Sequence, residues 1–155
     1  MVAKKANTPH QMGPRGVGYR VKVLSLVLGR ILQTSLQPYD LTPFHWLVLN
    51  TLWREDGLAV SAIGEKLQQV GGTMTGVLDR MEERGLIFRE RDPEDRRVWR
   101  TWLTQKGKDM GKTLPPIVSQ NREKLFSGVA SADLDCFNNV LEKLIENAKS
   151  MAEHQ

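Results

Sequence analysis

The chain has 155 residues, with 22 Lys and Arg against 18 Asp and Glu, and so carries a formal net charge of +4. This length suits one domain with an added helical region, and the small positive balance permits a polyanionic partner without requiring one. The single cysteine, Cys136, excludes an internal disulfide, and no apolar run approaches the roughly 20 residues that cross a bilayer, so we expect a cytoplasmic protein with no membrane partner.

The N-terminal segment differs in composition from the rest of the chain. Residues 1–18 are rich in Lys, Pro, Gly and polar residues and lack the apolar centre of a secretory signal, which predicts a flexible basic arm. Such an arm is compatible with a contact to DNA phosphates and equally with a solvated tail. From Tyr19 to Leu36, apolar residues cover more than one stripe of a predicted helix, which therefore needs cover on two sides. A second subunit is a natural cover in a chain of this size.

Three helices are predicted in the middle of the chain. The first begins at Thr42 and Pro43, because Thr suits the N-cap and Pro suits the first helical position. Ser61 is the expected N-cap of the second. The third follows a glycine-containing turn and ends at Gly85, a residue that accepts the left-handed conformation. Its apolar positions recur at i, i+3, i+4 and i+7, namely Met74, Val77, Leu78 and Met81.

A hairpin with a charged tip is predicted next. Residues 86–91 and 98–103 each alternate in polarity, as strands do. Between them lies Asp92-Pro93-Glu94-Asp95-Arg96-Arg97, whose Pro and Asp residues favour a turn. Asp95 is placed to hold the guanidinium of Arg97. The alternatives are that the tip is an ordinary solvated turn, or that Arg97 pairs with Asp79.

Two helices are predicted after the hairpin. Thr104 is the expected cap of the first, and Pro115-Pro116 predicts a kink or short break within it. The last helix has one apolar stripe and is expected to pack with the first helix of the chain in a separate helical layer. The predicted fold class is therefore mainly α with a small β-hairpin wing. A helix that fits a major groove about 12 Å wide, beside a narrow arginine-tipped hairpin, suits double-stranded DNA.

From Leu41 to Thr104 the sequence closely resembles the multiple antibiotic resistance regulator (MarR) family of winged helix-turn-helix transcription factors. Short motifs carry the resemblance, namely Leu41-Thr42, His45-Trp46, Leu78-Asp79-Arg80-Met81-Glu82, Gly85-Leu86-Ile87, Asp92 to Arg97, Leu103-Thr104 and Gly107. It implies a homodimer bound to a pseudo-palindromic operator, most often as a repressor. It also implies a DNA-binding domain at residues 41–104, with a helical dimerisation region at 19–40 and 105–155.

The resemblance assigns Thr73, Thr75, Gly76 and Arg80 to the recognition helix and Arg97 to the wing, and the residue pattern adds the others. The predicted DNA-binding residues are Ser61, Gly72, Thr73, Thr75, Gly76, Arg80, Arg96 and Arg97, with Asp79 and Asp95 as supports of the wing. Gly76 departs from the family, in which a long polar side chain is common at that position. Many relatives bind small aromatic or lipophilic effectors in a cleft, which here falls near Tyr39, His45 and Trp46. The alternative is that Trp46 belongs to the core and His45 to a polar surface.

Other chemistries are weakly supported by the sequence. Cys136 has no basic neighbour that would activate it, which favours a structural thiol over a redox sensor. His10, His45 and His154 lack the spacing of metal ligands, and no catalytic set or cofactor motif is recognisable, so an enzyme is not expected. The alternative functions are a redox- or metal-responsive regulator and a winged helix that docks a protein. The mixed recognition face and basic wing disfavour docking.

Overall fold

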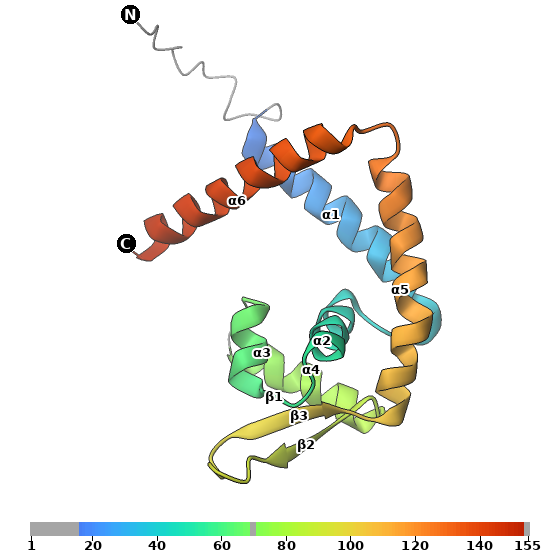
Figure 1. Cartoon of the computed structure of the whole chain (residues 1–155), viewed down its shortest axis with the longest axis vertical. Coiled ribbons are helices and arrows are strands. Elements are labelled where there is room, and N and C mark those ends of the chain that lie inside the picture. Colours follow the sequence, from blue (N-terminus) through green and yellow to red (C-terminus); the bar gives the residue numbers. More distant parts are fainter. Residues whose placement is uncertain (1–15, 69–70, 154–155) are drawn as a thin grey trace, which may run out of the picture. The chain divides into compact units, whose positions relative to one another are not determined.

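The computed structural model describes residues 16–68 and 71–153, and within the helix that starts at Gly71 it describes side chains from Met74 onward (Figure 1). The chain forms two compact units, one ending at Ser119 and the other beginning at Gln120. In chain order the elements are α1 (Val17–Leu36), the 3-10 turn η2 (Gln37–Tyr39), α2 (Pro43–Arg54), β1 (Leu58–Ala59), α3 (Val60–Lys66), α4 (Gly71–Glu83), β2 (Ile87–Arg91), β3 (Trp99–Leu103), α5 (Gln105–Phe126) and α6 (Ser131–Glu153).

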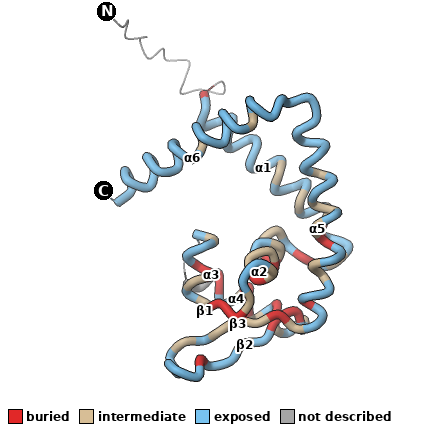
Figure 2. Tube along the Cα trace, viewed as in Figure 1, coloured by how far each residue is buried: buried red, intermediate tan, exposed pale blue. Residues whose placement is uncertain are grey.

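The hydrophobic core lies in the first unit, where α2, α3 and α4 pack with the small sheet (Figure 2). Leu49 and Leu52 of α2 are fully buried, as are Leu78 and Met81 of α4. Full burial of one such side chain contributes about 1.5–3 kcal/mol. In contrast, α6 in the second unit has no buried residue. The helices α2 to α4 and the sheet therefore share one packed core, to which Leu36 of α1 and Leu114 of α5 also belong.

The sheet is antiparallel, with strand order β1-β3-β2. The hairpin of β2 and β3 pairs Ile87 with Leu103 at its base and Arg91 with Trp99 at its far end. This hairpin was predicted to within one residue at each end, and its position confirms a winged fold. The two-residue strand β1 was not predicted, because Leu58 and Ala59 show no alternation by themselves and become a strand only by pairing with β3.

Predicted helix ends had mixed outcomes. Thr42 caps α2 as expected, since its hydroxyl oxygen accepts a hydrogen bond of 3.2 Å from the amide of His45. Gly85 follows α4 with a φ of +64°, as its predicted role requires. The prediction for Ser61 was wrong, because Ala59 occupies the N-cap of α3 without a side-chain cap and Ser61 is the second helical residue. This helix follows β1 directly and starts at Val60, two residues earlier than a cap at Ser61 would place it.

Of the kink or short break expected at Pro115 and Pro116, the break is absent, since α5 runs through both prolines. Leu114 is fully buried in the core and Gly111 packs against the indole of Trp53, so tertiary contacts hold the helix just before the prolines. Residues 1–15 of the predicted arm lie outside the described residues. Within the described part of the chain, no helix has the length and hydropathy needed to span a membrane.

Arg84 links the end of α4 to the turn that joins α1 to α2. Its guanidinium donates to the carbonyl oxygen of Tyr39 at 3.1 Å and to the carbonyl oxygen of Asp40, and forms a 2.9 Å ion pair with the Asp40 carboxylate. Asp40 has a φ of +55°, a left-handed conformation that Asp tolerates better than most residues. The Arg84 side chain thus contacts the turn between α1 and α2 at three points, in addition to the backbone hydrogen bonds within that turn.

Candidate nucleic-acid interface

Helix α4 has one face in the core and one face toward solvent. Met74, Val77, Leu78 and Met81 form its buried face, as their spacing predicted. Thr75 is exposed, and a methyl group placed on Gly76 would meet no atom within 4 Å. The side chains of the predicted contacts Gly72 and Thr73 lie outside the described residues. The exposed face of α4 is therefore accessible to a ligand as large as a DNA duplex.

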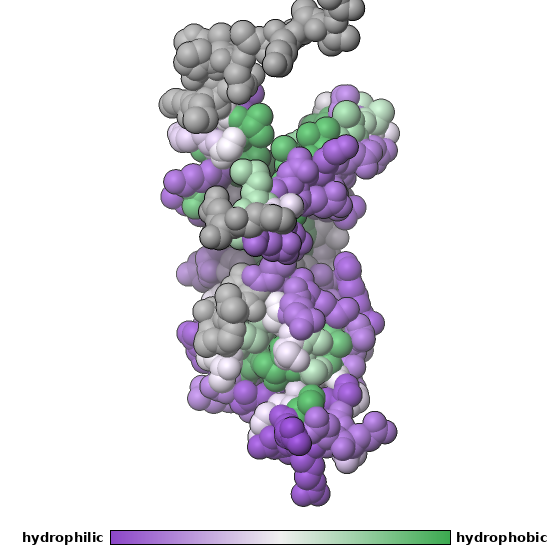
Figure 3. All heavy atoms as spheres, turned by 90° about the vertical axis from the view of Figure 1, so that its left-hand side faces the viewer, coloured by the Kyte–Doolittle hydropathy of each residue, from purple (hydrophilic) through white to green (hydrophobic). Residues whose placement is uncertain are grey.

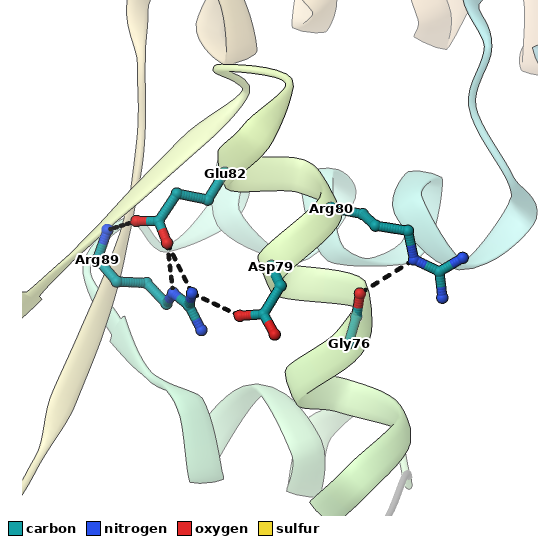
Figure 4. A network of polar contacts seen from close by, with 5 residues as sticks. All are labelled: Gly76, Asp79, Arg80, Glu82 and Arg89. Carbon is teal, nitrogen blue, oxygen red and sulfur yellow. Dashed lines mark hydrogen bonds and ion pairs between the residues drawn. The ribbon is translucent and has the colours of Figure 1, made fainter.

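A polar network ties α4 to the wing (Figure 4). Glu82 accepts three hydrogen bonds from Arg89 of β2, from its amide at 2.8 Å, its Nε at 3.0 Å and its Nη2 at 2.6 Å. Asp79 accepts a fourth from the same Nη2 at 2.6 Å. Partial burial by itself lowers the pKa of Arg89, but the hydrogen bonds to Glu82 and Asp79 outweigh it and raise that pKa. The network, called here the Glu82–Arg89 brace, fixes strand β2 against α4.

Arg80 lies on the other side of α4 from this brace (Figure 4). Its Nε donates to the carbonyl oxygen of Gly76 at 3.1 Å, one turn earlier in the same helix. The side chain is exposed, so it can leave this weak local contact for a phosphate or a base edge.

The wing loop, residues 92–98, is organised around the carboxylate of Asp92. Its Oδ1 accepts hydrogen bonds from the amides of Glu94 at 2.8 Å and Asp95 at 3.0 Å, and its Oδ2 is paired with the guanidinium of Arg100. The amide of Asp95, the guanidinium of Arg100 and the amide of Glu94 together lower the pKa of Asp92 to about 2. The loop is therefore a fixed turn and not a freely solvated segment.

Arg96 and Arg97 stand at the tip of this turn, both exposed. Among the residues that the structure describes, neither guanidinium has a hydrogen bond or ion pair. Asp95 holds the backbone amide of Arg97 at 3.0 Å, where the sequence had suggested a contact with its guanidinium. The suggested Asp79–Arg97 pair is not formed either, because Asp79 is engaged by Arg89. Figure 3 shows that the lower end of the molecule, where the hairpin lies in Figure 1, is largely hydrophilic.

A cavity of about 600 Å³ joins the exposed face of α4 to the wing. It is lined by Val60, Ser61, Thr75, Glu82, Arg89, Arg97, Val98 and Trp99. Three predicted DNA-binding residues, Ser61, Thr75 and Arg97, thus meet on one concave surface, although they come from three separate elements. The exposed face of α4, this concave surface and two arginines that have no partner among the described residues therefore lie close together in the first unit.

Comparison with known proteins agrees with this class. The family model described as MarR family matches residues 41–99. HTH-type transcriptional regulator TtmR of Methylorubrum extorquens (strain PA1) is 37% identical over 92 residues, which cover 59% of this chain and only 47% of TtmR. The uncharacterized HTH-type transcriptional regulator YkoM of Bacillus subtilis (strain 168) is 30% identical over 105 residues, 68% of each protein. The chain belongs to the MarR family of DNA-binding transcriptional regulators.

Solved structures agree as well. A MarR transcriptional regulator from Methanosarcina mazei Go1 has a TM-score of 0.75 at 27% identity, with 87% of this chain and 90% of that chain covered. The transcriptional repressor CouR, solved on a 23-mer DNA duplex, has a TM-score of 0.79 at 26% identity, with 86% and 96% covered. The family consists of regulators and not of enzymes.

The residues predicted to surround an effector are engaged within the protein. His45 is buried, and its Nδ1 accepts a hydrogen bond from the amide of Thr42 at 3.2 Å, which completes the cap of α2. Burial, followed by the charges of Arg84 and Arg80, lowers the pKa of His45 and so favours the neutral ring, although Asp40 opposes this. His45 is therefore not the polar surface residue of the second interpretation.

Trp46 is partly buried against the core and packs edge-to-face on Trp53, with ring centroids 5.6 Å apart. Tyr39 offers its carbonyl oxygen to Arg84. A second cavity of the first unit, about 530 Å³, is lined by other residues, namely Ser25, Leu26, Gly29, Arg30, Gln33, Thr34 and Pro43. Among the described residues no group of His, Cys, Asp and Glu is arranged to hold a metal ion.

Sequence reasoning missed the residues that position the interface. These residues bind within the wing or between the wing and α4, and they are Glu82, Arg89, Arg91 and Arg100. Each looks like a solvated charge in the sequence. The one available signal was that arginines at 89 and 91 fall on the same side of a predicted strand as the buried Ile87.

Proposed function

We propose that the protein is a homodimeric repressor that binds a pseudo-palindromic operator and is released by a small aromatic or lipophilic effector. The observation that carries the DNA-binding part concerns the guanidinium groups of Arg96 and Arg97, which have no partner within residues 16–68 and 71–153. They stand on an ordered turn beside the exposed face of α4. Unpaired arginines on a narrow hairpin are suited to the negative potential of a minor groove.

The homodimer is supported by apolar surface left uncovered on α1. Residues Val17, Val21, Leu24, Leu26, Val27 and Ile31 are all exposed. A helix that exposes so much apolar surface needs a partner, and two-fold symmetry is the commonest solution. We expect twice the monomer mass in light scattering at micromolar concentration. A monomer at that concentration would overturn this part of the proposal.

Selection of duplexes from a random library by the purified protein tests the DNA-binding part. We expect two related half-sites with centres about 10 bp apart, because a dimer presents its two recognition helices to successive major grooves. Replacing Arg97 by Ala should weaken binding to the selected duplex at least about tenfold. Arg122→Ala, which removes an exposed arginine of the second unit, is the charge-matched control and should change affinity less than about twofold. Equal effects of the two substitutions would refute the role of the wing.

For the effector site we propose the 530 Å³ cavity between α1 and the start of α2, in place of the surroundings of Tyr39, His45 and Trp46 that the sequence suggested. Its volume suits a small ligand, and Arg30 among its lining residues can pair with a carboxylate. An effector that prefers a dimer with misplaced wings lowers operator affinity by shifting the population. We expect benzoate-type acids to release the selected duplex from the wild type, and Arg30→Ala to lose this response while still binding DNA. Release that is unaltered by Arg30→Ala would exclude this cavity.

A further inference from the structure

Arg96 and Arg97 are joined by one peptide unit, and both of its polar atoms are bound by side chains. The carbonyl oxygen of Arg96 accepts a 2.7 Å hydrogen bond from Nη1 of Arg91, and the amide of Arg97 donates at 3.0 Å to Oδ1 of Asp95. A peptide unit is planar, so its orientation sets the directions in which the side chains on both sides of it leave the backbone. The directions of the Arg96 and Arg97 side chains thus depend on the contacts that Arg91 and Asp95 make with this peptide unit.

Arg91 is itself held in place by Trp99. The guanidinium carbon of Arg91 lies 4.2 Å from the centroid of the Trp99 ring, and the two residues form the last cross-strand pair of the hairpin before the wing loop. Stacking on a fixed indole restricts a side chain that would otherwise sample many rotamers. Trp99 also lines the cavity that contains Thr75 and Arg97. The stack therefore connects the geometry of the wing tip to that of the recognition surface.

We propose that Arg91, supported by Trp99, is a positioning residue for DNA recognition, which orients the Arg96–Arg97 peptide so that the wing arginines reach their groove. This inference rests on the DNA-binding function proposed above. A direct contact between Arg91 and a phosphate is the competing explanation, because Arg91 is exposed and charged. The two explanations differ in whether Arg91 matters once the wing arginines are gone.

A double-mutant cycle separates them, with the duplex enriched by the wild type as the probe. Arg91→Ala should weaken binding about fivefold or more in the wild type. In a protein that carries Arg96→Ala and Arg97→Ala, the same change should have less than about a twofold effect and leave the salt dependence unchanged. Additive losses, or a fall of about 0.9 in the salt slope on that background, would show a direct phosphate contact and overturn the proposal.

Arg91→Lys provides a second test, which does not require the protein with Arg96→Ala and Arg97→Ala to bind DNA. Lysine keeps the charge but lacks the planar group that stacks on an indole and donates in a fixed direction. We expect Arg91→Lys to lose at least half of the binding free energy that Arg91→Ala loses. Full recovery by lysine would mean that charge alone matters and would refute a positioning role.

The hairpin provides a matched control for Trp99. Phe88 is 43% exposed and Trp99 is 44% exposed, but Phe88 pairs with Trp102 on the opposite face of the hairpin. Trp99→Ala should weaken binding as Arg91→Ala does, and Phe88→Ala should change it less than about twofold. Thermal unfolding of each variant checks that the fold is intact. Equal losses from Trp99→Ala and Phe88→Ala would overturn the proposal, whereas a wild type that selects no duplex would overturn the DNA-binding function itself.

Discussion

The Glu82–Arg89 brace is expected to be the polar contact on which the position of the wing most depends. Replacing Glu82 by Gln keeps the shape of the side chain but removes the charge that accepts three hydrogen bonds from Arg89. Hydrogen bonds to charged groups contribute about 1.5–3 kcal/mol when buried. The side chains of Arg89 and Glu82 are 20% and 36% exposed, so solvent screens part of this energy. We expect the free energy of unfolding to fall by about 1–2 kcal/mol.

Urea denaturation followed by circular dichroism measures this loss, with the slope of the transition as a check on two-state behaviour. The matched control is Glu83→Gln, the next residue of α4, which is exposed and has no ion pair among the described residues. Its effect should stay within about 0.5 kcal/mol. Combining Glu82→Gln with Asp79→Asn should give a non-additive loss, because both carboxylates bind the same guanidinium. If Glu82→Gln and Glu83→Gln destabilised equally, the brace would contribute nothing and the reasoning would be refuted.

Three further predictions follow from single sites. Gly107→Ala should destabilise by about 2–4 kcal/mol in the same urea assay, since its methyl group would overlap the carbonyl oxygen of Leu86, and a change below about 1 kcal/mol would contradict that packing. The pKa of Asp92 is lowered from 3.8 to about 2, so this carboxylate stabilises the fold above pH 3.8 and the contribution is lost as pH falls through about 2. A carbon-detected NMR titration of the Asp92 carboxyl group should show a midpoint near pH 2. A midpoint near 3.8 would contradict the hydrogen bonds that this carboxylate accepts in the wing loop. Gly76→Ala has open space for its methyl group and should stabilise α4 by up to about 1 kcal/mol, so a loss of stability would show that the glycine is needed for packing.

The sequence predicted those features that depend on local periodicity. Each of these features depends on residues that are close together in the sequence. They are the apolar face of α4, the cap at Thr42, the end of the helix at Gly85 and the hairpin. The family resemblance then supplied the class of protein.

What the sequence missed depends on contacts between distant segments. Strand β1 exists only because β3 is beside it, and α5 passes its two prolines because Leu114 is anchored in the core. The alternative that His45 lies on a polar surface was wrong, because it is buried and completes a helix cap. Charged side chains were the least predictable, because an arginine that binds a carboxylate across two elements has the same pattern as one in water.

The contact made by Arg84 has a mechanical consequence. The turn between α1 and α2 is gripped by the last turn of α4 through the carbonyl oxygens of Tyr39 and Asp40 and the carboxylate of Asp40. A shift of α1 that lifts this turn must either pull the end of α4 along with it or break the three contacts of Arg84. In the first case a displacement of α1 is transmitted to α4. In the second case the two helices move independently. Exchange of the amides at the end of α4, compared between the wild type and Arg84→Ala, would show which of the two occurs.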